Sequence, residues 1–191
     1  MDKGRLEAFS DGVIAVIITI MVLELKVPQG TDWAALRPVI PVFLSYVLSF
    51  VYVGIYWNNH HHMLQACQKV NGRVLWANLH LLFWMSLVPV VTGWMGGNHS
   101  ATVPVALYGS VLLLTGIAYL ILSRELIALH GEKSPLAVAL GRDDKGKVSL
   151  MLYAVAIGLS FVRTWIALAV YAFVALMWIA PDPRIEKRIA E

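Results

Sequence analysis

The sequence predicts an all-α integral membrane protein with six transmembrane helices. Of its 191 residues, 59% are apolar and 14% are charged, whereas soluble domains average about 45–50% apolar and about 25% charged residues. The apolar residues gather in six segments, and none of these shows the alternation of a β-strand. We therefore expect one six-helix membrane domain over residues 1–191, with spans at about 5–26, 39–63, 74–95, 102–123, 148–162 and 164–181.

The first span begins with a cluster of polar side chains, which comprises Arg5, Glu7, Ser10 and Asp11. An uncharged run follows over residues 12–23, and Thr19 is its one polar side chain. A helix over residues 5–26 is about 33 Å long, which is enough to cross a hydrocarbon core of about 30 Å. The acidic flank and the lack of a small-residue cleavage site argue against a signal peptide.

The second and third spans meet at a polar boundary. The second span ends in tyrosine and tryptophan followed by Asn58-Asn59-His60-His61-His62, a sequence typical of a membrane interface. The third span contains Asn78, His80 and Pro89, and neighbouring helices can satisfy the carbonyl that a proline frees. The run Thr92-Gly-Trp-Met-Gly-Gly near its end indicates a glycine-rich turn.

The last three spans are separated by one long polar segment. Gly109 and Gly116 lie seven residues apart in the fourth span, and small residues allow helices to approach closely. Residues 124–147 indicate a solvent-exposed loop after a short helical extension. The fifth and sixth spans are short and tightly joined at Arg163, so we expect a peripheral hairpin, followed by a charged tail from Pro181.

The distribution of lysine and arginine predicts the orientation. With the amino terminus inside the cell, the inner segments hold twelve of these residues and the outer segments hold three, namely Lys26, Arg37 and Arg163. The positive-inside rule therefore predicts a multi-pass protein of the cell membrane with both termini in the cytoplasm. The net charge of +3 is spread over the loops, so nucleic acid is not an expected partner.

Several kinds of transport and catalysis are excluded by what the spans lack. They contain no recurring arginine for sensing voltage, no Thr-Val-Gly-Tyr-Gly filter, and no mid-membrane carboxylate to relay protons. Three consecutive histidines point about 100° apart on a helix and cannot hold one ion. His80 has no neighbouring nucleophile or base. We therefore expect no enzymatic activity, no metal site and no cofactor.

Arg5-x-x-x-Phe9-Ser10-Asp11 on a first membrane helix resembles the signature of the transmembrane protein 175 family of potassium channels. The resemblance is close over the first thirty residues and loose over the rest of the chain. It implies a homo-oligomeric, tetrameric channel in the bilayer, in which the first helix lines a central pore for K⁺. Counted from the motif, the pore constriction falls at Val16, Ile20 and Leu23, and Thr19 supplies a hydroxyl among them.

The residues themselves leave the pore-lining face open. Gly12, Val16, Thr19 and Leu23 share one face of a helix and Ile20 lies beside them, but the other faces are also apolar. A ring of aliphatic side chains would give moderate selectivity for K⁺ among monovalent cations, because passage demands partial dehydration and K⁺ holds its water less tightly than Na⁺. Such constrictions gate by dewetting. A non-selective or proton-permeable channel, a small-solute exporter and a structural membrane protein remain as alternatives.

The signature residues are expected to position the first helix in the bundle. Polar groups one turn inside the membrane need partners, because unpaired ones cost several kcal/mol. At the same cytoplasmic depth, the candidate partners are Asn58, His60, Trp76, Asn78 and His80. Attraction of cations by Glu7 or Asp11 is the alternative role for the acidic residues.

Overall fold

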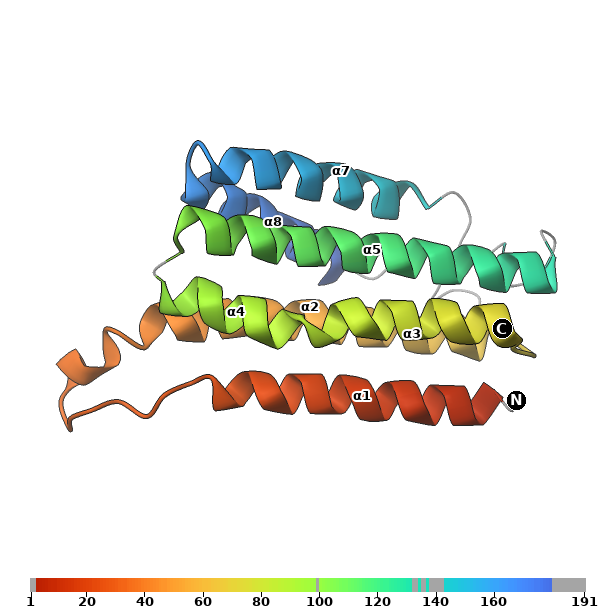
Figure 1. Ribbon diagram of the computed structural model, residues 1–191, viewed down its shortest axis with the longest axis horizontal. Coiled ribbons are helices and arrows are strands. Elements are labelled where there is room, and N and C mark those ends of the chain that lie inside the picture. The colour runs from red at the N-terminus through yellow and green to blue at the C-terminus, as the bar shows by residue number, and fades with distance from the viewer. Residues whose placement is uncertain (1–2, 99, 132–133, 135–136, 138–142, 180–191) are drawn as a thin grey trace.

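The computed structural model describes residues 3–98, 100–131, 134, 137 and 143–179, and these form a bundle of helices lying along one axis (Figure 1). The described residues contain no strand, so the predicted all-helical fold is confirmed. The helices are α1 (Lys3–Leu23), η1 (Trp33–Leu36), α2 (Ile40–Gln65), α3 (Gly72–Ser86), α4 (Val88–Gly97), α5 (Thr102–His130), α7 (Asp144–Ser160) and α8 (Thr164–Ile179).

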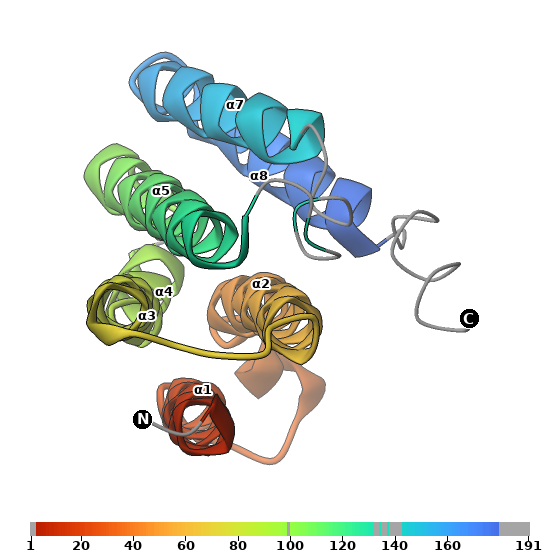
Figure 2. The same ribbon diagram turned by 90° about the vertical axis from the view of Figure 1, so that its right-hand side faces the viewer.

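The bundle is layered, with α1 at one edge (Figure 2). α1 packs on α2, α3 and α4, while α5 packs on α3 and α4 from the other side and also contacts α7 and α8. Each α-helix contributes to one hydrophobic core, whose largest fully buried side chains include Tyr52, Tyr108 and Tyr171. α1 is therefore attached to the bundle along one side, and none of the described helices covers its other side.

Spacing explains which side of α1 is buried. The buried residues recur every three or four positions, which is one stripe of an α-helix, and they are Leu6, Ser10, Ile14, Ile17 and Met21. Nothing in the apolar pattern of residues 12–23 could distinguish this stripe from its neighbours. The packing of α2, α3 and α4 decides it.

Within the part of the chain that the structure describes, four helical segments are long and apolar enough to cross a membrane: α1, α2, the combined α3–α4 segment and α5. α7 and α8 are shorter, at 17 and 16 residues. α5 continues to His130, seven residues beyond the expected end of the fourth span, so that its 29 residues reach about 44 Å. The polar segment after this span is thus helical at first. The predicted charged tail from Pro181 lies outside the described residues.

The third span is two helices rather than one. α3 ends at Ser86 and α4 begins at Val88, with Leu87 between them. Pro89 sits in the first turn of α4, where its missing N–H is tolerated. Pro89 cannot donate a backbone hydrogen bond to the carbonyl of Met85, and its ring crowds that carbonyl, which interrupts the helix in the turn before the proline. The two helices together still form one apolar segment, Gly72–Gly97, that is long enough to cross a membrane.

The glycine-rich run after Thr92 is helical, so the predicted turn is wrong. Its glycines serve close packing instead. A Cβ on Gly96 would lie 2.7 Å from the Cα of Val42, and one on Gly93 would lie 2.8 Å from Oε2 of Glu24. α2 and α4 therefore approach backbone to backbone at Gly96, as small residues allow in membrane helices.

Candidate functional site

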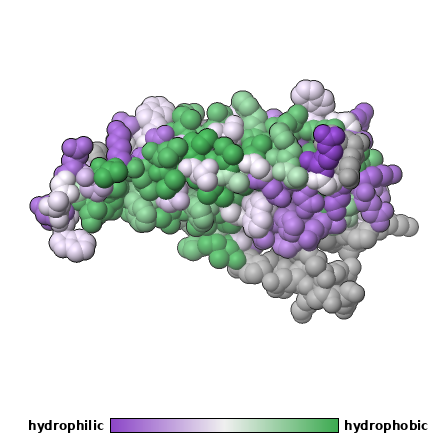
Figure 3. Space-filling model, turned by 90° about the horizontal axis from the view of Figure 1, so that it is seen from below, coloured by the Kyte–Doolittle hydropathy of each residue, from purple (hydrophilic) through white to green (hydrophobic). Residues whose placement is uncertain are grey.

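The outward side of α1 carries the residues expected to form the pore constriction. Val16, Ile20 and Leu23 are 54%, 44% and 79% exposed. Val16 and Leu23 point well away from the buried stripe of the same helix, and Ile20 lies beside its edge. Figure 3 views the molecule from the side on which α1 lies and shows a hydrophobic middle between hydrophilic ends. An apolar helix face is thus presented outward, to lipid or to another copy of the chain.

Thr19 shares this exposed face. Its Oγ1 donates a hydrogen bond to the carbonyl oxygen of Val16 at 2.9 Å. The hydroxyl proton is therefore satisfied by the helix itself, and the oxygen lone pairs point away from that bond. Thr19 can therefore accept a hydrogen bond or coordinate a cation on the exposed side of α1, but its proton is already donated to Val16.

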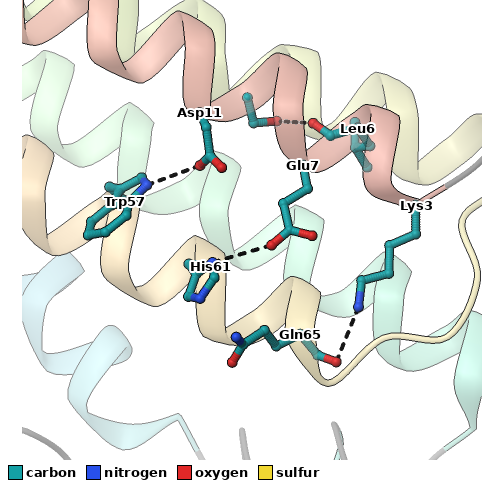
Figure 4. Close-up of polar contacts among 8 residues, drawn as sticks. Lys3, Leu6, Glu7, Asp11, Trp57, His61 and Gln65 are labelled. Atoms are coloured by element: carbon teal, nitrogen blue, oxygen red, sulfur yellow. Dashed lines mark hydrogen bonds and ion pairs between the residues drawn. The ribbon is translucent and has the colours of Figure 1, made fainter.

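A ladder of polar contacts joins the start of α1 to the end of α2 (Figure 4). Nζ of Lys3 donates to the carbonyl oxygen of Gln65 at 3.3 Å. Glu7 Oε1 lies 3.3 Å from Nδ1 of His61. Nε1 of Trp57 donates to Oδ1 of Asp11 at 3.0 Å. Because the two helices are antiparallel and the contacts recur every four residues on each, one face of α1 is matched to one face of α2.

A second set of contacts is fully buried on the neighbouring face of α1. Oγ of Ser10 donates to the carbonyl oxygen of Leu6 at 2.8 Å and accepts from Nδ2 of Asn78 at 2.9 Å. Oδ1 of Asn78 lies 2.7 Å from Nε2 of His60. Since the Asn78 amide nitrogen already faces Ser10, its oxygen must accept, so His60 donates from Nε2. This relay, His60–Asn78–Ser10, links α2, α3 and α1.

The other residues expected to take part lie elsewhere. His80 accepts a hydrogen bond at 2.8 Å from Nε1 of Trp84 on its own helix. Trp76 is 75% exposed, and Asn58 is exposed on α2 one position away from Trp57. These three are not brought to the signature residues. Within the signature, Arg5 and Phe9 are exposed, on the same outward side as the expected pore residues.

Sequence reasoning missed the contacts of Trp57, His61 and Gln65. The signal was present in the spacing, because Lys3, Glu7 and Asp11 are four apart and so are the three α2 residues. Two such series on antiparallel helices can pair along their length. His60 was proposed as a partner, whereas its neighbour His61, about 100° round the helix, reaches the ladder.

The loop between α2 and α3 is held by the end of α5. Nε2 of His130 accepts from the backbone N–H groups of Gln68 and Lys69 at 3.1 and 3.3 Å, and its Nδ1 donates to Leu126 O at 2.9 Å. Cys67 in this loop is buried, and burial raises the pKa of its thiol to about 11. The thiol is therefore neutral near pH 7.

The fold and the site together define an integral membrane protein built from apolar helices, with one exposed apolar helix anchored to its bundle by polar contacts at one end. A model of the family described as endosomal/lysosomal potassium channel TMEM175 matches residues 5–89. A potassium channel of Chryseobacterium sp. (strain P1-3) is 56% identical over 191 residues, which is 100% of both chains. The chain belongs to the TMEM175 family, whose members are ion channels and not enzymes.

Two further comparisons describe the range of the family. The crystal structure of a lysosomal potassium-selective channel TMEM175 homolog from Chamaesiphon minutus matches with a TM-score of 0.77 and 26% identity, covering 93% of this chain and 96% of that one. A mouse relative named endosomal/lysosomal proton channel TMEM175 is 32% identical over 102 residues, which are 47% of this chain and 20% of the relative. The bacterial match spans the whole fold, and the mouse match spans part of a much longer protein.

Proposed function

We propose that this chain is a potassium channel of the cell membrane, assembled from four copies around a central pore lined by α1. The observation that carries the proposal is that Val16, Ile20 and Leu23 are all exposed on α1 and lie outside the buried stripe that packs on the bundle. One helix cannot enclose a pore. Several copies related by rotation place identical side chains in rings.

The rings would select ions through dehydration. Aliphatic side chains offer a cation no oxygen ligands, so passage requires the ion to shed water or the constriction to widen and admit it. K⁺ holds its water less tightly than Na⁺ and therefore meets the lower barrier. Thr19 oxygens form a weak coordinating layer between the rings at Val16 and Ile20. The resulting preference for K⁺ is moderate.

The ladder and the relay would hold α1 at the pore. They tie its cytoplasmic end to α2 and α3 through Asp11, Glu7 and Ser10. A buried polar group without a partner is costly in a membrane, so these contacts favour one placement of α1. The signature residues thus act as positioning residues, while conduction depends on the outward face.

The orientation follows from the positive-inside rule. Both termini lie in the cytoplasm, and residues 1–191 form a single membrane domain. The end of the bundle that holds the ladder then faces the cytoplasm, and Leu23 faces the outer mouth of the pore. The permeant ion is K⁺, and the bilayer and identical subunits are the partners.

Two measurements on the purified channel in lipid bilayers test the proposal. Bi-ionic reversal potentials are expected to show preference for K⁺ over Na⁺, and equal permeability would contradict it. Ile20→Ala and Leu23→Ala are expected to raise the leak of both ions, because each widens a ring. Val22→Ala is the matched control, since Val22 is 44% exposed but turned about 100° from Leu23. Unchanged currents in both ring variants would remove these residues from the pore.

The role of Asp11 is tested by Asp11→Asn. The amide oxygen can still accept from Trp57, while the negative charge is lost. If Asp11 positions the helix, single-channel conductance is expected to stay within about twofold of the wild type. The Asp11 carboxylate is then engaged with the Trp57 indole and does not act on the permeating ion. A large fall in conductance with the assembly intact by size-exclusion chromatography would assign Asp11 to ion attraction instead.

Proton permeation is the second candidate function, and the name of the mouse relative favours it. A chain of water transiently admitted between apolar rings would carry protons as well as K⁺. Currents measured in a pH gradient at equal K⁺ on both sides separate the two. A reversal potential that follows the pH gradient would make protons the main charge carrier. Solute-dependent flux without steady current would indicate an exporter.

A further inference from the structure

A cavity lies inside the subunit, away from the proposed pore face of α1. It is bounded by α2, α5, α7 and α8, and its enclosed volume is about 40 Å³. That is room for a small group, since a single water molecule needs about 10–15 Å³ on the same measure. The cavity lies at the level where α7 begins and α8 ends, which is the cytoplasmic side in the proposed orientation.

Five of the thirteen described residues that line the cavity are aromatic. Tyr56 and Tyr119 meet edge to face with ring centroids 6.1 Å apart, and Tyr52 and Tyr153 are also 6.1 Å apart. The indole of Trp178 closes another side, with Nε1 donating to Ser149 at 2.8 Å. The indole is therefore fixed by a hydrogen bond, and the tyrosine rings are fixed by one another.

A glycine opens the space between the rings. A Cβ on Gly116 would lie 2.8 Å from a methyl carbon of Leu150 and 3.5 Å from the hydroxyl oxygen of Tyr56. The absent side chain therefore lets α5 approach α7 while the Tyr56 ring keeps its place in the wall. Tyr56 also has no hydrogen bond to any of the described residues.

A carboxylate stands at the α7 end of this aromatic wall. Asp143 precedes α7, and its Oδ1 accepts from the N–H of Gly146 at 2.9 Å. It is the charged residue among the described residues that line the cavity. Just outside, Nζ of Lys145 lies 4.9 Å from the centroid of the Trp178 ring, so one aromatic face of the wall already holds an ammonium group.

We propose that this cavity binds an organic ammonium group, with the cation against the tyrosine rings and Asp143 as its counter-ion. Aromatic faces attract quaternary and alkyl ammonium groups through their quadrupoles. A carboxylate at the mouth adds charge complementarity and excludes anions. The same chemistry is supplied by soluble organic amines and by the ethanolamine headgroup of a phospholipid at the cytoplasmic interface.

The site is separate from the ion path. Its walls come from α2, α5, α7 and α8, whereas the proposed pore is lined by α1, which packs on α2, α3 and α4. The inference therefore does not depend on which ion the channel carries. Binding is measured without reference to conduction, so failure of either proposal is recognised independently of the other.

Equilibrium dialysis of radiolabelled choline against the purified full-length protein tests the proposal. Asp143→Asn is expected to weaken binding by about tenfold or more, because the charge is lost while asparagine still caps α7. Asp144→Asn is the matched control, since Asp144 is the next residue, its side chain is 68% exposed and it does not line the cavity. It is expected to leave the affinity within about twofold.

The aromatic contribution is tested at Tyr56. Tyr56→Phe keeps the ring and is expected to retain binding, whereas Tyr56→Leu is expected to weaken it by about tenfold. Dimethylbutanol, the neutral carbon isostere of choline, serves as the competing probe. If it displaces choline with equal affinity, or if Asp143→Asn and Asp144→Asn behave alike, the site recognises apolar bulk and the proposal is overturned.

The source of the ammonium group is distinguished in nanodiscs. Choline binding is compared between discs of phosphatidylglycerol alone and discs that also contain phosphatidylethanolamine. Weaker choline binding in the second set supports the proposal with a lipid headgroup as occupant. Equal binding in both sets supports it with a soluble amine as occupant.

Discussion

Ser10 is the residue at which α1 is tied most tightly to its neighbours. It is fully buried, donates to its own helix and accepts from Asn78, which in turn accepts from His60. Ser10 and Asn78 each donate one hydrogen bond and accept another. Removing a member leaves another buried group of the relay without a partner, so we expect the relay to hold the start of α1 in place.

Ser10→Ala is expected to destabilise the protein by about 1–2 kcal/mol, because Nδ2 of Asn78 loses its acceptor in a buried site. The measurement is thermal or denaturant unfolding of the purified protein in detergent. Ser86→Ala is the control, since the exposed Ser86 only donates to Phe83 on its own helix. If both variants have the same unfolding midpoint as the wild type, the relay does not hold α1 in place.

At the scale of the helices, glycine residues allow the closest contacts between neighbouring helices. Gly96 of α4 lies against the backbone of α2. In α5, the Tyr171 hydroxyl from α8 fills the space that a Cβ on Gly109 would occupy. The seven-residue spacing of Gly109 and Gly116 pointed to such contacts. The packing contacts of Gly93 and Gly96 could not be predicted from the sequence, because three glycines in six residues are equally typical of a turn.

Gly96→Ala is expected to destabilise the bundle by about 1–3 kcal/mol, because the new methyl group overlaps the Cα of Val42 and the backbone must shift. Gly97→Ala provides the comparison, as a Cβ there meets nothing within 4 Å. Unfolding midpoints of the two variants in detergent give the difference. Equal midpoints would show that α2 and α4 can separate at little cost.

At the scale of the whole molecule, apolar length predicted the four long spans, which are α1, α2, the α3–α4 segment and α5. The fifth and sixth spans stay a prediction, because α7 and α8 are shorter. The break at Leu87 depends on one proline, and the extension of α5 to His130 depends on contacts with the loop after α2. The exposed side of α1 was not predictable from periodicity, since residues 12–23 are apolar all round. Its assignment needed the packing of α2, α3 and α4.

The candidate site was predictable in part. The signature residues, together with the depth of His60 and Asn78, pointed to a polar connection between the first three spans. The sequence did not identify Trp57 and His61 as partners, because that requires knowing which faces of α1 and α2 meet. Asn58, Trp76 and His80 have suitable chemistry and depth but lie on other faces of their helices.

The proposed channel function depends on several copies of α1 surrounding one rotation axis. The most direct test is an experimental map of the assembled protein in a lipid nanodisc that resolves the number of copies and the direction of each α1. We expect four copies, with Val16, Ile20 and Leu23 facing the rotation axis in successive rings. A map in which residues 12–23 face lipid, away from any axis, would contradict the account.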